Sequence, residues 1–205
     1  MSERYPNSRV CGQYERKSIR QERKPIVNLV ESLRRFDGKR TSDLEQLSAS
    51  MSRSAGSVAR LLAVAEHDET TVQVGATWIL KRWLEEGVAH VERSAVNLVQ
   101  LLAHATHWQV RLHLLQMLAS LCVPVESLSV LAKELPGLLM DDNKFVRAWA
   151  LSTLANVADQ NDALRQKVIS MMKNAGNDDA ASVRARVRQI QKRYSWATPA
   201  GLTKR

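Results

Sequence analysis

The stretch Glu134–Val157, ELPGLLMDDNKFVRAWALSTLANV, decides the fold. It opens with an apolar segment interrupted by Pro136, passes through the polar residues 141–143, and continues with Val146 followed by Ala and Leu at intervals of three or four residues. Apolar residues at that spacing lie on one face of a helix, and a cluster of Asp and Asn marks a turn. The stretch therefore predicts two helices joined by a short turn.

The same pattern occurs four times along the chain. Its anchors are four valines at intervals of 38, 36 and 37 residues: Val72, Val110, Val146 and Val183. Apolar residues recur eight and eleven positions before every anchor and four positions after it, and residues of helix-capping type stand four positions before: Asp68, Thr106, Asp142 and Asp179. One helical hairpin cannot cover its own apolar face, so the repeat predicts an all-α solenoid of stacked hairpins.

The two ends of this array differ from its middle. The last unit has Arg188 and Gln191 at positions that are mostly apolar in the other units, as expected of a polar terminal repeat. Before the array, Ser42 and Glu45 match a capping box within a degenerate leading hairpin. We therefore divide the chain into a basic flexible arm (1–25), the leading hairpin (26–54), the repeat array (55–195) and a tail (196–205).

Composition agrees with a helical, soluble chain. The 205 residues include 8 Gly and 5 Pro and are 5% aromatic, so signals for strands are few. No segment approaches the roughly 18 consecutive apolar residues of a transmembrane helix, and the charged N-terminus lacks the apolar centre of a secretory signal. Cys11 and Cys122 form no CxxC motif, which favours a cytoplasmic or other reducing compartment over a disulfide scaffold or zinc module.

Positive charge is concentrated at the ends. The formal net charge is +9, of which residues 1–25 supply +4 and residues 181–194 supply +5, so the rest of the chain sums to zero. Such an excess favours polyanions or acidic protein surfaces as partners.

The repeat units resemble HEAT repeats, and the resemblance covers about residues 55–194. It is strongest in Glu134–Val157, with its proline-interrupted first helix, an Asp in the turn and Val-Arg opening the second helix. The Asp and Val-Arg spacing recurs at Asp178 and Val183-Arg184. The resemblance implies that Arg111, Arg147 and Arg184 form a hydrogen-bonded ladder with turn aspartates; a phosphate-binding row of arginines is the alternative.

Residues outside the core columns of the second helices are candidates for contact with a protein partner. Large aromatic side chains and charged groups are common anchors at interfaces. This set comprises Trp78, Arg82, His113, Lys144 and Trp149. Junction packing is the alternative for the tryptophans, whereas Trp83 occupies a core column.

A second candidate set could bind a polyanion. The helix expected over 181–194 has five cations and no acid, and like charges at i, i+4 spacing repel, which suggests a use for them. A solvated capping helix is the alternative. With the arm, the set comprises Arg16, Lys17, Arg20, Arg23, Lys24, Arg184, Arg186, Arg188, Lys192 and Arg193.

No catalytic motif occurs: GxxxxGK[ST], GxGxxG, GxSxG and HExxH are all missing. The paired His104 and His107 lack nearby Cys, Asp or Glu, so we expect neither a metal nor a cofactor. A weaker resemblance to helical-repeat DNA glycosylases of the AlkD type fails at the expected carboxylate, because no Trp is followed one turn later by an acid. The sequence favours a non-catalytic scaffold or adaptor for protein partners in a multi-subunit complex, with nucleic-acid binding as the alternative.

Overall fold

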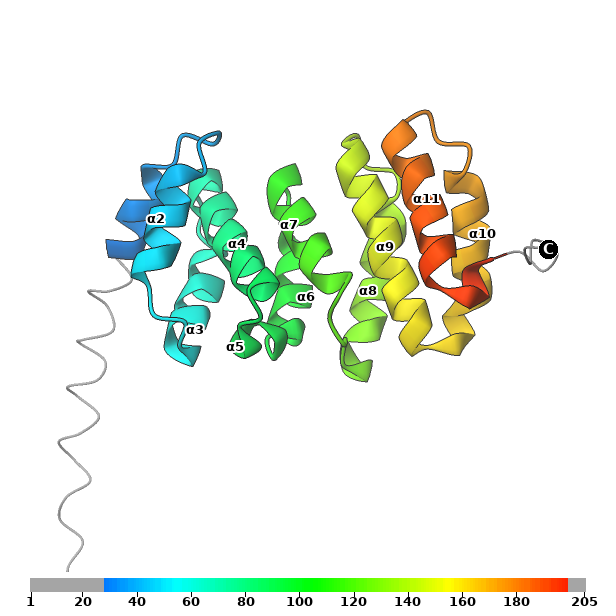
Figure 1. Ribbon diagram of the computed structural model, residues 1–205, viewed down its shortest axis with the longest axis horizontal. Helices are drawn as coiled ribbons and strands as arrows, with labels where there is room; N and C mark the ends of the chain where they lie inside the picture. Colours follow the sequence, from blue (N-terminus) through cyan, green and yellow to red (C-terminus); the bar gives the residue numbers. More distant parts are fainter. Residues whose placement is uncertain (1–27, 199–205) are drawn as a thin grey trace, which may run out of the picture.

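The computed structural model describes residues 28–198, and these residues form helices joined by turns (Figure 1). Residues 28–34 are helical and precede α2. The remaining elements are α2 (Ser42–Ser50), α3 (Ala55–Val64), α4 (Thr70–Glu85), α5 (Ala89–Glu92), α6 (Ala95–His104), α7 (Trp108–Leu118), α8 (Val125–Leu138), α9 (Lys144–Gln160), η1 (Asp162–Leu164), α10 (Arg165–Ala175), α11 (Ala181–Arg193) and η2 (Ser195–Ala197). No helix within 28–198 is both long and apolar enough to cross a membrane.

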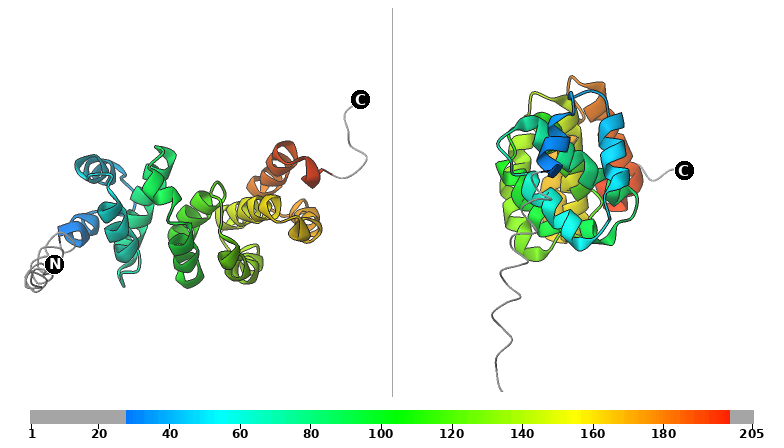
Figure 2. Two further views of the ribbon diagram at one scale, coloured as in Figure 1. Left: turned by 90° about the horizontal axis from the view of Figure 1, so that it is seen from below. Right: turned by 90° about the vertical axis from the view of Figure 1, so that its left-hand side faces the viewer.

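The helices form two layers. The first helices of the four hairpins, α3, α6, α8 and α10, lie in one layer, and their partners α4, α7, α9 and α11 lie side by side in the other (Figure 2). Each second helix packs against the second helix of the next hairpin, and α2 packs against α4. The predicted all-α solenoid of four hairpins behind a leading hairpin is thus confirmed.

The core follows the repeated apolar columns. All four valine anchors are buried, with at most 3% of their surface exposed. Trp83 is completely buried, as its column predicts, and its Nε1 donates to Ser48 Oγ at 2.9 Å. This bond satisfies the indole N–H inside the core and attaches α4 to α2, so the leading hairpin shares one core with the array.

The predicted helix caps were wrong by one residue. The residues that precede the second helices are Glu69, His107, Asn143 and Ala180. Only Asn143 caps with its side chain, which accepts from the amides of Phe145 and Val146. The predicted capping box was also wrong, since the hydroxyl of Thr41, the residue that precedes α2, donates to Glu45 Oε1 instead.

The turn aspartates explain this shift in the last two units. Asp141 and Asp178 each accept a hydrogen bond from the amide two residues later, at 2.8 Å in both cases. This local turn uses two residues beyond the aspartate before helical geometry begins, so the following Asp142 and Asp179 cannot reach the first helical amides as caps.

A repeated side-chain bond fastens each second helix to its own turn. The residue after each valine anchor donates to the carbonyl oxygen six residues earlier. The pairs are Gln73 with His67 (2.7 Å), Arg111 with Ala105 (2.8 Å), Arg147 with Asp141 (3.0 Å) and Arg184 with Asp178 (2.6 Å). The four units therefore share this polar device as well as their apolar columns.

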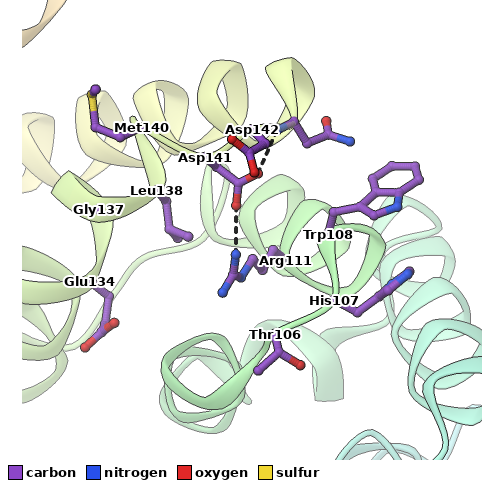
Figure 3. Close-up of a pocket in the computed structure, with 11 residues that line it drawn as sticks. Thr106, His107, Trp108, Arg111, Glu134, Gly137, Leu138, Met140, Asp141 and Asp142 are labelled. Carbon is purple, nitrogen blue, oxygen red and sulfur yellow. Dashed lines mark hydrogen bonds and ion pairs between the residues drawn. The ribbon is translucent and has the colours of Figure 1, made fainter.

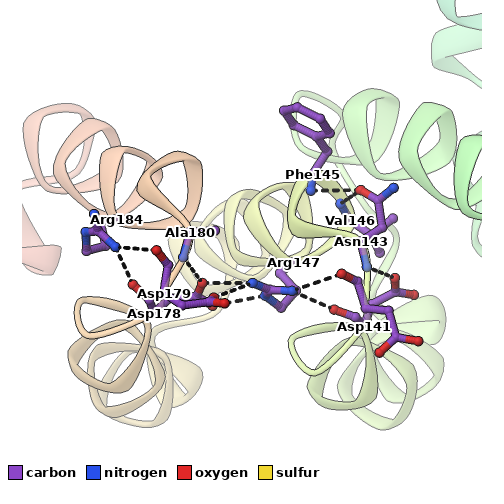
Figure 4. Close-up of polar contacts among 10 residues, drawn as sticks. Asp141, Asn143, Phe145, Val146, Arg147, Asp178, Asp179, Ala180 and Arg184 are labelled. Carbon is purple, nitrogen blue, oxygen red and sulfur yellow. Dashed lines mark hydrogen bonds and ion pairs between the residues drawn. The ribbon is translucent and has the colours of Figure 1, made fainter.

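Two of these arginines, Arg111 (Figure 3) and Arg147 (Figure 4), also bind the next repeat, as in the ladder that the HEAT resemblance implies. Arg111 Nη1 lies 2.8 Å from Asp141 Oδ2, and Arg147 binds Asp178 through Nε at 3.0 Å and Nη2 at 2.9 Å. Hydrogen bonding from Arg147 lowers the pKa of the Asp178 carboxyl to about 2. Among residues 28–198, Arg184 binds only carbonyls of its own turn. The ladder is structural and links the last three hairpins.

A candidate partner-binding groove on the second-helix layer

A groove of about 300 Å³ crosses the second-helix layer over α7, α9 and α11. It is lined by Gln116, Ala119, Ser120, Trp149, Ser152, Arg186, Gln189, Ile190, Arg193 and Tyr194. Two guanidinium groups and two aromatic rings stand among these residues, and no carboxylate does. We call this the second-helix groove.

The centre of the second-helix groove is a cation stacked on an indole. Trp149 and Arg186 each stand three positions after their valine anchor, so neighbouring repeats bring them to adjacent places on α9 and α11. The Arg186 guanidinium carbon lies 3.9 Å from the centroid of the Trp149 ring. At this distance the positive charge is attracted to the negative face of the indole.

Arg186 differs from the ladder arginines in lacking an acid. Burial lowers the pKa of its guanidinium, which remains charged at neutral pH. Within residues 28–198 Arg186 makes neither an ion pair nor a hydrogen bond, whereas Arg147 binds the carboxylates of both Asp178 and Asp179. A half-buried, uncompensated guanidinium is costly, and it is positioned to bind an anionic group.

Polar side chains form a row beside this pair. Gln116, Ser152 and Gln189 each stand six positions after an anchor and therefore repeat from α7 to α9 to α11. The Oε1 atom of Gln116 is buried and has no hydrogen-bond partner in the part of the chain that the structure describes. Such a row can bond the backbone of an extended segment laid across the helices.

The far end of the groove is formed by the end of α11. Arg193 lies with its guanidinium carbon 5.2 Å from the ring centroid of Tyr194, and both residues line the groove. Burial raises the pKa of Tyr194, so its phenol is neutral at physiological pH. The groove therefore has a cation at its centre and a second one at its end.

One predicted contact residue, His113, was placed wrongly. It is 8% exposed and its Nδ1 lies 3.0 Å from Thr77 Oγ1, so it joins α7 to α4 inside the stack. Gly75 occupies the equivalent position in the preceding repeat, where the side chains of Leu33 and Leu44 pack close to the α4 backbone. Burial is the main reason that the pKa of His113 falls to about 3.

The other predicted contact residues lie in three places. Trp149 lines the groove. Trp78 on α4 is half-buried and packs against the hydrophobic core. Arg82 is exposed on the same helix, and its Nε lies 2.9 Å from Glu86 Oε1. Lys144 is exposed at the start of α9, over the ring of Phe145. The structure thus separates a set that the sequence grouped together.

The predicted polyanion-binding cations are divided as well. Arg186 and Arg193 line the groove, whereas Arg188 and Lys192 are exposed elsewhere on α11 and make no ion pair within residues 28–198. Arg184 binds the carbonyl oxygens of its own turn. The arm residues Arg16, Lys17, Arg20, Arg23 and Lys24 lie outside the described residues.

The polar row and Tyr194 were not predicted as contact residues. The signal was present in the repeat alignment, because the column six positions after each anchor contains polar residues in three of four units. In the described range, no cluster of three or more His, Cys, Asp or Glu is arranged to hold a metal ion.

No protein family model matches this chain, and no curated protein matches it. Among solved structures, one similar chain is a designed armadillo repeat protein, YIII(Dq.V1)4CPAF, in complex with the peptide (KR)4. The two chains share 13% sequence identity with a TM-score of 0.49, over 88% of this chain and 95% of the designed one.

Proposed function

We propose that this protein is a non-catalytic scaffold of HEAT type that binds an acidic segment of a protein partner in the second-helix groove. The observation that supports this most directly is the Arg186 guanidinium, half-buried on Trp149 and without a carboxylate from residues 28–198. An Asp or Glu of a partner would supply the missing counter-charge. The cytoplasm, or another reducing compartment, remains our expected location.

The shape and chemistry of the groove favour an extended segment. The polar row spans three successive second helices, which is the arrangement needed to bond several peptide groups along one chain. Arg186 and Arg193 are both available to carboxylates. Trp149 adds an aromatic surface, and its side chain loses little conformational entropy on binding. Recognition would then depend on acidic side chains flanking an extended backbone.

Binding of a labelled acidic peptide, measured by fluorescence anisotropy, tests the proposal. The probe is a 12-residue peptide rich in Glu and Asp, and the key variant is Arg186→Gln with Arg193→Gln. The matched control, Lys167→Gln with Lys173→Gln, removes two exposed cations from α10 of the same hairpin. We expect the Kd to rise about 10-fold or more in the groove variant and to change little in the control. Equal effects in both variants would refute the assignment.

Nucleic-acid binding is the second candidate function. It is favoured by α11, where Arg186, Arg188, Lys192 and Arg193 all lack an ion pair within the described range. A gel-shift titration with generic duplex DNA and RNA tests it, because affinity should fall steeply with salt where several phosphates are neutralised. No shift at about 50 mM salt would remove this candidate.

A further inference from the structure

A second groove lies away from the second-helix groove, on the edge where the hairpin turns gather. It has a volume of about 800 Å³ and lies between the α6–α7 turn and the α8–α9 turn (Figure 3). We call it the edge groove. It is lined by Thr106, His107, Trp108, Arg111, Glu134, Gly137, Leu138, Met140, Asp141, Asp142 and Asn143.

Exposed apolar side chains are concentrated at this edge. Trp108 is 40% exposed and Met140 is 83% exposed, and both line the edge groove. Phe145, which is 46% exposed, stands at the start of α9 close by in sequence. The other exposed large apolar residues in the range 28–198 are Val96 and Val125. Such a concentration of exposed apolar surface is typical of a binding site.

The charge of the edge groove is opposite to that of the second-helix groove. Arg111 and Asp141 neutralise each other at 2.8 Å. Burial lowers the pKa of His107, so its imidazole is neutral at pH 7. Glu134 and Asp142 remain and give the lining a net charge of about −2 at neutral pH. Lys133 lies 3.9 Å from Glu134, but its side chain is 84% exposed and free to turn into solvent.

We propose that the edge groove binds a basic segment of a second protein partner, with apolar side chains of that segment against Trp108 and Met140, which lie on opposite sides of the groove (Figure 3). Charge complementarity selects this occupant, because the lining has two carboxylates, Glu134 and Asp142, beyond the Arg111–Asp141 pair, around an apolar surface. This site is separate from the second-helix groove, so the scaffold would bind two partners. An acidic segment would bind in the second-helix groove and a basic segment in the edge groove.

Anisotropy with a labelled 12-residue peptide, rich in Lys and Arg around a central Leu, tests this site. Glu134→Gln with Asp142→Asn should raise the Kd about 5- to 20-fold, and Met140→Ser about fivefold, because they remove the counter-charges and the exposed apolar contact. The control variant, Asp43→Asn with Glu126→Gln, removes two exposed carboxylates from α2 and α8 and should bind as the wild type does. Since Met140 is so exposed, its variant is expected to fold.

Two further probes separate the alternatives. The same peptide with Ser in place of the central Leu should bind at least fivefold more weakly. Binding that is equal in all variants, or no binding at low salt, would overturn the proposal. A synthetic peptide of residues 1–25 is the third probe. If it binds the edge groove more tightly than the generic peptide, the occupant is the basic segment of this chain and the assignment to a different protein is wrong.

Discussion

Lowering the pH from 7.5 to 4.5 is expected to reduce the free energy of unfolding through His113. This side chain is buried between α4 and α7, bonded to Thr77, and its pKa is about 3 against an ordinary value of 6.5. Desolvation is the main cause, and Lys81 and His107 add smaller repulsions. The folded protein therefore holds a neutral imidazole throughout this pH range.

The sign and size follow from the two pKa values. Above pH 6.5 the imidazole is neutral in both the folded and the unfolded state, so it makes the stability of the protein no lower there. Below pH 6.5 the imidazole is protonated in the unfolded chain but remains neutral in the folded protein. The free energy of unfolding therefore decreases as the pH is lowered from 6.5 to about 3. Each pH unit in this window costs about 1.4 kcal/mol, which gives a loss on the order of 3 kcal/mol at pH 4.5.

Urea unfolding followed by circular dichroism at the two pH values measures this loss. His113→Gln removes the titrating group but retains a side chain that can bond Thr77. Its stability should therefore fall by about 3 kcal/mol less than that of the wild type between pH 7.5 and 4.5. Carboxylates such as Asp178 titrate in both proteins and cancel in the difference. His104→Gln, at an exposed position, should behave as the wild type. Equal acid sensitivity of the wild type and His113→Gln would refute the reasoning.

The ladder and the helix packing allow further predictions. Arg147→Gln should lower the free energy of unfolding by about 2–3 kcal/mol, because Asp178 loses two charge-assisted bonds, while Arg184→Gln should cost about 1 kcal/mol. Urea titration ranks the two, and the reverse order would contradict a ladder that links repeats. Gly75→Ala should destabilise by about 1–3 kcal/mol, because its Cβ would lie 2.8 Å from a leucine methyl of helix 28–34. At Gly137 inside α8 an added Cβ would meet no atom within 4 Å, so Gly137→Ala should raise the free energy of unfolding by about 0.5–1 kcal/mol. The melting temperature should therefore fall in the Gly75 variant and rise in the Gly137 variant, and shifts in the same direction would contradict this packing.

The solenoid could be predicted because apolar residues at helical spacing surround each anchor valine, and this local pattern recurs along the chain. Val72, Val110, Val146 and Val183 recur at nearly constant intervals, and stacking is the way for such hairpins to bury their apolar faces. The short helix α5 was not expected. It lies in the longest of the three intervals, where the connection has room for an extra turn.

The side-chain chemistry of the face was harder to predict because it depends on pairs about 37 residues apart. Gly75, His113, Trp149 and Arg186 share one column, but each has a different environment because its neighbour in the adjacent repeat differs. His113 is buried beside Thr77, whereas Trp149 is covered by Arg186. Residue type at one position therefore does not determine exposure in this column.

The edge groove illustrates the same difficulty between turns. Trp108 and Met140 come from different hairpins, and neither belongs to a repeated column. They line one groove only because α6–α7 stacks on α8–α9. Sequence periodicity gives the order of the hairpins but not the shape of the space between their turns.

Site-directed photo-crosslinking tests the central claim most directly. A photoreactive residue placed at Gln189, which lines the second-helix groove beside Arg186, would be irradiated in extract of the source cells after nuclease treatment, with Lys167 on α10 as the control position. Mass spectrometry would identify the crosslinked segments. The proposed function predicts Asp- and Glu-rich protein segments at Gln189 that disappear when Arg186 and Arg193 are replaced by Gln. Segments without acidic enrichment, or crosslinks that persist in that variant, would contradict it.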